Sequence, residues 1–251
     1  MNTPPLDVLA IGAHPDDVEL AAGGTMRLCA ISGYRTGIID LTRGELGSRG
    51  TPKLRAQEAQ AAAEILGLCI RENLGLPDGN ISRDASLHVV RALRRWRPRV
   101  VLTHPTQCRH PDHVHTATLV VEACYYSGLR KLVTRNASGE DQAPWRPQHV
   151  LHFAEVLPFE PTFVVDVSDT WSDRTRALSC YASQVHDPDY VAHEEEPETY
   201  ISNPDFFQWI EARARTYGHA IGAKFGEPFI YRGAFGTKDL MALLAHETAF
   251  K

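Results

Sequence analysis

The chain has 251 residues, of which 43% are hydrophobic and 23% are charged, and its formal net charge at pH 7 is −5. This composition is typical of a globular protein with one large core, so we expect a single domain over residues 1–251. The mild acidity argues against a nucleic-acid partner, because such proteins carry a basic excess or a basic stripe. The arginines between positions 91 and 99 are interpreted as the solvated face and end of a helix.

The cysteines and the N-terminal segment bear on the cellular compartment. The five cysteines are scattered and never form a C-x-x-C pair, which indicates neither a disulfide framework nor a cysteine zinc site. The first apolar run, residues 6–11, is too short for a signal peptide or a membrane span. We therefore expect a cytoplasmic protein without a membrane partner.

The first half of the chain alternates short apolar runs with longer helical stretches, which is typical of a parallel sheet covered by helices. The predicted strands cover residues 7–11, 36–41, 71–74 and 100–103, and the predicted helices cover residues 19–31, 52–66, 85–96 and 113–127. Thr51 and Pro52 are a suitable N-cap and first residue for the second helix, and Gly67 is a suitable stop.

The second half begins with a polar, proline-bearing connector at residues 136–147. Apolar, β-branched runs predict two further strands at residues 150–154 and 163–167. A helix is predicted from residue 169 to residue 184.

Residues 185–204 contain three prolines and a run of glutamates without periodicity, which predicts a long loop. Loops of this length in compact domains are often lids or binding elements, so Tyr190 and Tyr200 are candidates to reach an active site. A helix at residues 205–221 follows, then an irregular stretch rich in glycine and proline. A short amphipathic tail at residues 238–249 is a candidate for a subunit interface.

Polar side chains cluster where two predicted strands end. His14, Asp16 and Asp17 follow the first strand, and the segment 109–113 (Arg-His-Pro-Asp-His) follows the fourth. In open α/β sheets the ligand site lies beyond the carboxyl ends of the strands, so these groups are expected to meet. A catalytic zinc usually has three nitrogen or oxygen ligands and an open fourth position, and His14, Asp17 and His113 would supply such a set.

The motif at residues 13–17 (Ala-His-Pro-Asp-Asp), with His110-Pro111-Asp112-His113 downstream, resembles the LmbE/PIG-L family of zinc-dependent N-acetylglucosaminyl deacetylases over most of the chain. Segments 40–52, 72–79 and 163–168 resemble the bacillithiol-biosynthesis branch, whose members deacetylate N-acetylglucosaminyl malate. The resemblance implies a Rossmann-like α/β sandwich, with a mainly parallel sheet covered by helices on both faces. It also implies a homo-oligomer, a trimer or a hexamer.

The resemblance also implies a division of roles. His14, Asp17 and His113 would hold one Zn²⁺ per subunit, and Asp16 would act as general base. Zinc lowers the pKa of a bound water to about 7, so that a carboxylate can take its proton at neutral pH. A protonated His110 would stabilise the charge on the carbonyl oxygen, and Asp112 would orient His110 and favour its charged form. Iron(II) or cobalt would also suit this ligand set.

Four further residues are candidates for binding the substrate. Arg55 and Asp78 match positions at which family members hold sugar hydroxyls. Arg109 and Arg49 are candidates for an acidic aglycone, because a guanidinium pairs well with a carboxylate. Cys108 stands where relatives tend to carry an acidic residue, so the polarity beside the site is expected to differ.

Other interpretations stay open. The substrate would then be another GlcNAc conjugate, such as an inositol conjugate or a chitooligosaccharide, or the enzyme would be an amidase of thiol conjugates. From a different class, the chain would be a non-hydrolytic sugar- or nucleotide-binding module with a bound metal, although such a module has no need of Asp16. Four single histidines near the ends of predicted strands or helices are interpreted as structural, namely His104, His115, His152 and His219.

Overall fold

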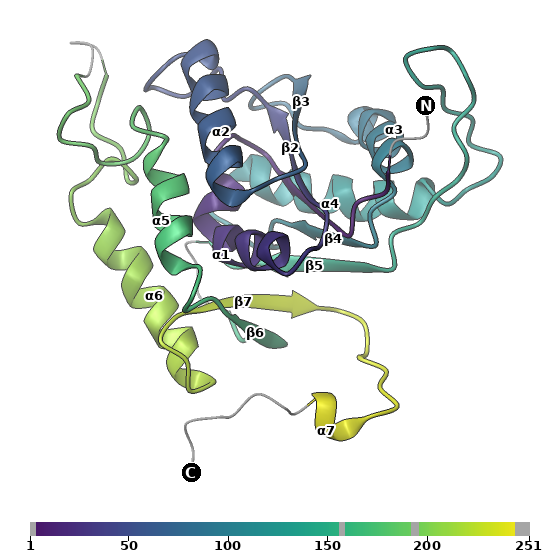
Figure 1. The fold of residues 1–251 in the computed structure, drawn as a ribbon. Helices are drawn as coiled ribbons and strands as arrows, with labels where there is room; N and C mark the ends of the chain where they lie inside the picture. The colour runs from purple at the N-terminus through teal and green to yellow at the C-terminus, as the bar shows by residue number, and fades with distance from the viewer. Residues whose placement is uncertain (1–3, 156–158, 192–195, 244–251) are drawn as a thin grey trace.

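A computed structural model describes residues 4–155, 159–191 and 196–243 (Figure 1). The strands of this part of the chain are β1 (Val8–Gly12), β2 (Thr36–Thr42), β3 (Ile70–Leu76), β4 (Val100–Thr103), β5 (His149–Phe153), β6 (Phe163–Asp166) and β7 (Gly226–Tyr231). Its α-helices are α1 (Asp17–Ile31), α2 (Pro52–Leu66), α3 (Ser86–Trp96), α4 (Pro111–Tyr126), α5 (Trp171–Ser179), α6 (Phe206–Ala220) and α7 (Leu240–Leu243), and a short 3-10 helix covers Arg83–Ala85.

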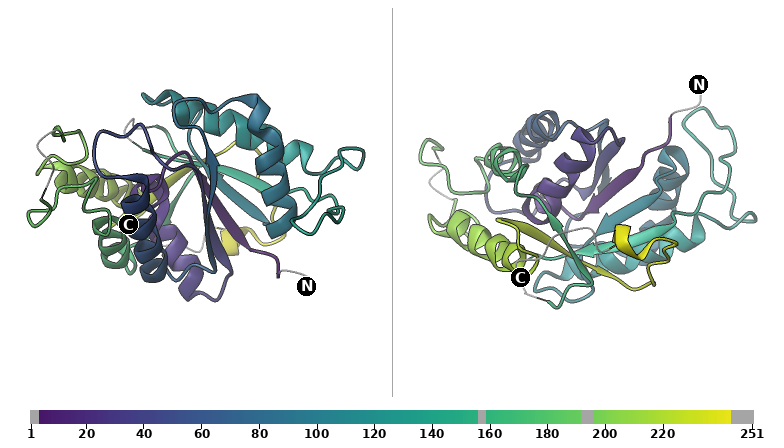
Figure 2. Two further views of the ribbon diagram at one scale, coloured as in Figure 1. Left: turned by 90° about the horizontal axis from the view of Figure 1, so that it is seen from above. Right: turned by 60° about the horizontal axis from the view of Figure 1, so that its bottom comes forward.

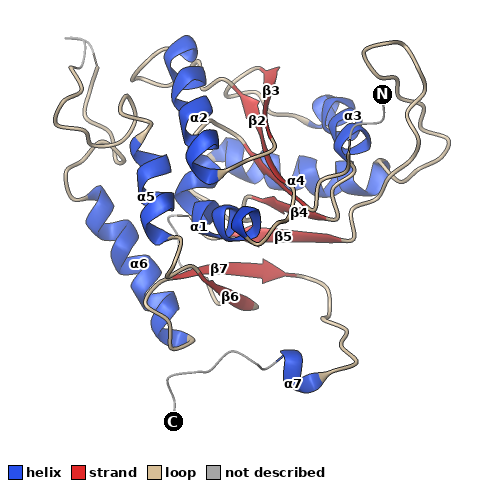
Figure 3. Cartoon of the chain, in the orientation of Figure 1, coloured by secondary structure: helices blue, strands red, loops and turns tan. Residues whose placement is uncertain are grey.

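The strands form one seven-stranded sheet in the order β3-β2-β1-β4-β5-β7-β6. The first five strands are parallel, and β7 runs antiparallel to both of its neighbours. Helices cover both faces (Figures 2 and 3): α1, α2 and α5 pack together on one side, and α3 and α4 on the other. The predicted α/β class and the mainly parallel sheet are therefore confirmed.

The central strands are buried on both faces. Along β1, Leu9 and Ile11 belong to the core under α3 and α4, whereas Val8 and Ala10 face the core under α1 and α2. This explains why the strand is a continuous apolar run rather than an alternating one. Helix α2 has the predicted ends, since Thr51 Oγ1 accepts a hydrogen bond from the Leu54 N–H at 3.2 Å and Gly67 has a φ of +72°.

The register of the parallel strands brings their carboxyl ends to one edge. Ile11 of β1 pairs with Thr103 of β4, and Thr103 pairs with His152 of β5. The loops that follow these three strands therefore leave the sheet side by side. Every residue of the candidate metal centre described below lies on or beside these loops.

Helix α5 is shorter than predicted, because it ends at Ser179 rather than at residue 184. The following residues turn away to bond other elements. The Ser183 N–H donates to Glu58 Oε1 at 2.8 Å, and the Tyr181 hydroxyl donates to Glu19 at 3.0 Å. The Ser183 N–H thus bonds α2 instead of a helical carbonyl, and the Tyr181 side chain holds this segment against α1.

The prediction of an irregular stretch after residue 221 was wrong, because residues 226–231 form strand β7 between β5 and β6. Gly226 and Pro228 are residue types that are rare in strands, so the sequence pattern does not predict a strand here. Pro228 is tolerated because it pairs only with β6, whereas β5 pairs with residues 229–231. The backbone partners of β7 are residues at least 60 positions away, for example Val164 for Pro228.

The predicted loop contains no helix or strand in its described parts, residues 185–191 and 196–204. Of the predicted tail, the structure describes α7, and residues 244–249 lie outside the described residues. No helix among the described residues is both long enough and apolar enough to cross a membrane.

Candidate metal centre and active site

A cavity of about 340 Å³ opens at the carboxyl edge of the parallel strands. Its walls combine the loop after β1, the start of α4, the end of β5 and parts of the loops after β2 and β3. The predicted residues that line it are His14, Asp16, Asp17, Arg55, Asp78, Arg109, His110, Asp112 and His113. The structure thus gathers into one site segments about a hundred residues apart in the sequence.

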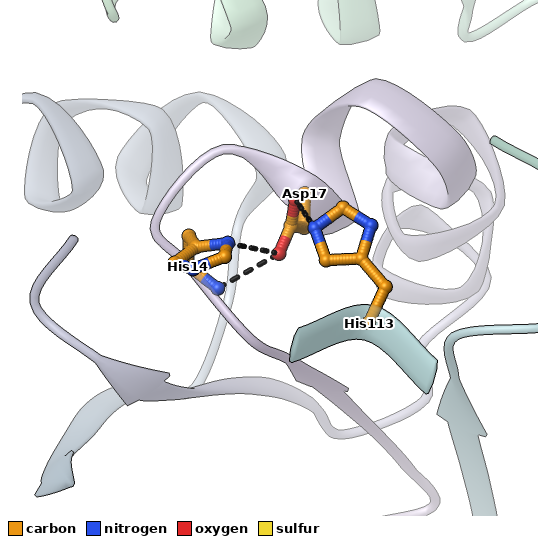
Figure 4. Close-up of side chains that lie close together, drawn as sticks. All are labelled: His14, Asp17 and His113. Atoms are coloured by element: carbon orange, nitrogen blue, oxygen red, sulfur yellow. Dashed lines mark hydrogen bonds and ion pairs between the residues drawn. The ribbon is translucent and has the colours of Figure 1, made fainter. Parts of the chain in front are cut away.

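Three side chains form a candidate metal centre (Figure 4). Asp17, the first residue of α1, lies between the two imidazoles, with its Oδ2 3.5 Å from His14 Nδ1 and its Oδ1 3.3 Å from His113 Nε2. One ligand atom from each lies within 4.8 Å of the others. Two nitrogens and one carboxylate oxygen around a common point suit a zinc site that keeps an open position.

Burial works against ionisation of Asp17, but His113 and His104 outweigh it and hold the pKa of its carboxyl well below the usual range. The carboxyl is therefore ionised, as a ligand must be. Its Oδ2 also accepts the His14 backbone N–H at 2.7 Å, which fixes the loop between β1 and α1.

Asp16 has a different environment from its neighbour Asp17. Its backbone adopts the left-handed conformation with a φ of +109°, which is strained for a residue other than glycine, and its side chain does not cap the helix. Asp16 Oδ2 lies instead 3.4 Å from Arg55 Nη2. Burial raises the pKa of Asp16 to about 7, and Arg55 partly opposes this shift. Asp16 is thus a buried carboxyl beside the triad.

His110 and Asp112 begin α4. His110 is the N-cap, and its Nδ1 accepts the Asp112 backbone N–H at 3.2 Å. The Asp112 carboxylate lies 3.4 Å from His14 Nε2 and accepts the Gly79 N–H at 2.8 Å. Burial and the nearby His113 lower the pKa of His110, although Asp112 acts in the opposite direction. The Asp112 carboxylate therefore bonds His14 and Gly79, whereas only its backbone N–H bonds His110, and the lowered pKa of His110 does not favour the charged ring that was predicted.

The sequence predictions missed Glu155, which follows β5 and bonds two imidazoles. Its carboxylate contacts His113 Nδ1 and His104 Nδ1. His104 Nε2 accepts the Ala13 N–H at 2.8 Å, so the proton of His104 lies on Nδ1 and is donated to Glu155. Burial would raise the pKa of Glu155, but His104 and His113 lower it to about 2.

Glu155 thereby fixes the ring of His113 so that Nε2 faces Asp17, as carboxylates behind metal-bound histidines commonly do. The signal in the sequence was its position directly after a predicted strand. His104, interpreted as structural, follows β4 at the same edge, and its Nε2 lies 3.3 Å from Asp17 Oδ2. Cys108 joins this group, since its thiol donates to Glu155 Oε2 at 3.1 Å.

The candidate substrate residues lie in different places. Asp78 Oδ1 is 2.9 Å from His14 Nε2, and its other oxygen accepts the Leu46 N–H at 2.9 Å. Arg109 lines the cavity with its guanidinium 5.0 Å from the centre of the Tyr200 ring. Arg49 is not among the described residues that line the cavity.

Arg49 instead connects loops. Its Nε donates to the Ser183 carbonyl at 3.0 Å, and its guanidinium lies 5.3 Å from the centre of the Tyr190 ring. The Tyr190 hydroxyl donates to Glu196 at 3.0 Å. Among the described residues of the predicted lid, Tyr190 and Tyr200 do not line the metal cavity, whereas Ile201 does.

Fold and site together define an α/β enzyme with a candidate histidine–aspartate metal centre at the carboxyl edge of its sheet. Residues 9–124 match the family model described as PIG-L, GlcNAc-PI de-N-acetylase. A 1D-myo-inositol 2-acetamido-2-deoxy-alpha-D-glucopyranoside deacetylase of Segniliparus rotundus is 30% identical to this chain, and the match covers 70% of this chain and 76% of that protein. The chain belongs to the PIG-L family.

Other relatives differ in their named activities. A 4-oxalmesaconate hydratase of Pseudomonas putida is 28% identical, and the match covers 74% of this chain and 77% of that protein. A probable N-acetyl-alpha-D-glucosaminyl L-malate deacetylase 2 of Bacillus cereus is 25% identical, and the match covers 81% of this chain and 94% of that protein. Among solved structures, a conserved protein of Thermus thermophilus has a TM-score of 0.79 and 36% identity, with 93% of this chain and 98% of that chain covered.

Proposed function

We propose that this enzyme hydrolyses the N-acetyl group of a GlcNAc conjugate with the help of a bound Zn²⁺, and that the conjugate is N-acetylglucosaminyl malate. The observation that carries the hydrolytic function is the position of Asp16, a buried carboxyl beside the triad that pairs with Arg55. A metal held only for structure does not require this group, whereas hydrolysis requires a base.

The triad would hold Zn²⁺, which when bound lowers the pKa of a water molecule and polarises a carbonyl oxygen. Asp16 then accepts the proton of the attacking water. A pKa near 7 suits this task, because a base with that pKa is partly ionised at neutral pH and still binds a proton strongly. Arg55 holds the carboxyl of Asp16 in place.

His110 is proposed to donate a hydrogen bond to the carbonyl oxygen of the amide. Its Nδ1 accepts a backbone N–H, so the proton of the neutral ring lies on Nε2. The ring is thus a donor even with its lowered pKa. Donors of this kind contribute about 3 to 4 kcal/mol to transition-state stabilisation in other enzymes.

The malate conjugate is supported by two observations. Arg109 lies exposed at the rim of the cavity, where its guanidinium is placed to meet a carboxylate. The Bacillus cereus relative, matched over 94% of its length, is named for this substrate. Arg55 and Asp78 are the proposed partners of the sugar hydroxyls.

The test is acetate release by the zinc-loaded protein from N-acetylglucosaminyl malate, free GlcNAc and a GlcNAc-inositol conjugate, in parallel with hydration of 4-oxalmesaconate. We expect acetate release with a clear preference for the malate conjugate. Comparable rates on all three sugars would support the deacetylase and reject the malate assignment. Hydration of 4-oxalmesaconate without acetate release would replace the proposed function by that of the Pseudomonas putida relative, and no turnover in any assay would reject it.

A further inference from the structure

A small cavity lies between helices α1, α5 and α6 and strand β7, and we call it the arginine cavity. Its charged lining residues are Arg174, Arg213 and Glu227. The centre of a water-sized sphere can move within about 10 Å³ of this cavity. It therefore has room for one water molecule or one small ion, and none for a carboxylate or a phosphate group.

We infer that the arginine cavity binds a monovalent, monatomic anion, chloride, between the guanidinium groups of Arg174 and Arg213. The two arginines are neither metal ligands nor proposed substrate partners. The inference is therefore independent of the proposed function. It assigns a binding site to a part of the molecule that the catalytic chemistry does not use.

Arg174 carries hydrogen-bond donors that have no acceptor. The residue is only 1% exposed, and its Nη2 donates to the Leu20 carbonyl. Its Nε and Nη1 have no hydrogen-bond partner among the described residues. Buried donors on a charged group are costly when they are left unpaired, so an acceptor in the cavity that they line is expected.

The two guanidinium groups converge on one oxygen atom. The Leu20 carbonyl accepts Nη2 of Arg174 and also Nη2 of Arg213, the latter at 2.9 Å. Two positive charges this close repel each other, and the repulsion is stronger where little water screens it. Burial lowers the pKa of Arg174 to about 9, and the charge of Arg213 acts in the same direction. An anion between the two groups removes this conflict.

The nearby carboxylates are already engaged. Glu227 is the only carboxylate among the described residues that line the cavity, and its two oxygens accept the N–H groups of Gly24 and Thr25. Glu19, the other carboxylate that favours the charged form of the buried arginine, pairs with Arg71. Neither arginine forms an ion pair with a described carboxylate. Two cations and one carboxylate line the cavity, and one monovalent anion balances their charge.

The anion has a structural consequence for the support of the metal centre. The two arginines connect α5 and α6 to the Leu20 carbonyl of α1. Arg213 also donates to the carbonyl of Glu155, whose carboxylate contacts His113. An ion that neutralises the two guanidinium groups therefore stabilises the packing of α5 and α6 on α1. Because it binds the folded chain, its concentration raises the stability of the fold.

The test is the melting temperature of the zinc-loaded protein as sodium chloride replaces sodium gluconate at constant ionic strength. Gluconate is too large for the cavity, so the exchange changes only the supply of a small anion. Between about 3 and about 300 mM chloride we expect the melting temperature to rise by at least about 3 °C. A rise below about 1 °C would overturn the inference and assign the cavity to water.

A matched pair of variants locates the effect. Arg174→Met keeps a side chain of similar length without the charge, and the rise with chloride should fall below about 1 °C. Arg176→Met is the same change two residues further along α5, where the side chain is 65% exposed and pairs with Asp173. This control should keep the wild-type rise. A rise that persists in Arg174→Met would place the chloride elsewhere, for example on the zinc, and would overturn the inference.

A direct measurement keeps the inference testable if Arg174→Met does not fold. Crystals of the zinc-loaded wild-type protein grown with sodium bromide should show an anomalous peak within hydrogen-bond distance of Arg174 Nε or Nη1. No peak at this position would overturn the inference. A peak without any chloride effect on the melting temperature would mean binding at crystal concentration only, and would overturn it as well.

Discussion

The two parts of this chain contribute differently to the site. The first four strand–helix units supply the triad, Asp16, His110 and Asp112, all directly after β1 or β4. The part after residue 148 supplies support and walls: Glu155 bonds His113, Arg213 bonds the Glu155 carbonyl, and Ile201 lines the metal cavity. The reactive groups and the proposed substrate residues Arg55, Asp78 and Arg109 thus come from the regular parallel units, whereas the position of the His113 ring depends on Glu155 of the less regular second part.

The largest expected effect lies in the first part. Asp16→Asn removes the proposed base and keeps the size of the side chain, so kcat should fall by about 10² to 10⁴. Zinc content, measured by metal analysis of the dialysed protein, should remain near wild type. Asp17→Asn is the matched change in the next residue and should lower zinc content as well. Loss of zinc in both variants would mean that the roles of the two aspartates are exchanged.

Glu155→Gln tests whether the second part controls the first. A glutamine has one oxygen to accept hydrogen bonds, so it cannot replace the carboxylate that serves both His104 and His113. Zinc affinity, measured by competition with a chelator, should fall by about 10- to 100-fold. The surface variant Glu211→Gln is the control, and equal affinities in the two variants would show that Glu155 does not position His113.

Glu227 on β7 tests the structural link between the two parts. Helix α1 is interrupted at Ala22, and the buried Glu227 carboxylate accepts the N–H groups of Gly24 and Thr25 at 2.9 and 2.7 Å. Only glycine fits at position 24, since an added Cβ would lie 2.8 Å from Val167 Cβ.

Glu227→Ala leaves these two buried donors without their acceptor and should lower the free energy of unfolding by about 2 to 4 kcal/mol in urea denaturation. Glu227→Gln keeps one acceptor oxygen and should cost about half as much. A loss below about 0.5 kcal/mol in the alanine variant would show that water replaces the carboxylate.

The smallest effects are expected from the two arginines proposed for an acidic aglycone. Arg109 is exposed at the cavity, so Arg109→Ala should raise KM for N-acetylglucosaminyl malate about two- to fivefold, the range for an exposed ion pair. Arg49 bonds loop carbonyls, so Arg49→Ala should affect KM less than Arg109→Ala does. Steady-state kinetics on the malate conjugate compares them, and a larger KM effect for Arg49 would reverse the assignment.

Local features of the sequence were sufficient for much of the fold. The apolar runs of β1, β2 and β4 and the caps of α2 follow from side-chain pattern and backbone preference over a few residues. The motif after β1 and the histidines after β4 could be assigned to one edge, because parallel strands end together. The end of α5 could not be predicted, since Ser183 bonds Glu58, which lies 125 residues away.

Short segments and the topology of βα units were enough to predict the α/β fold, the sheet edge at which His14, Asp17 and His113 lie, and the extra carboxyl of Asp16. The insertion of β7 between β5 and β6 and the contact between Glu155 and His113 could be seen only in the folded chain. The physical reason is that strand pairing, hydrogen bonds between distant segments and cavity shape depend on how the whole chain packs, which local propensity does not encode.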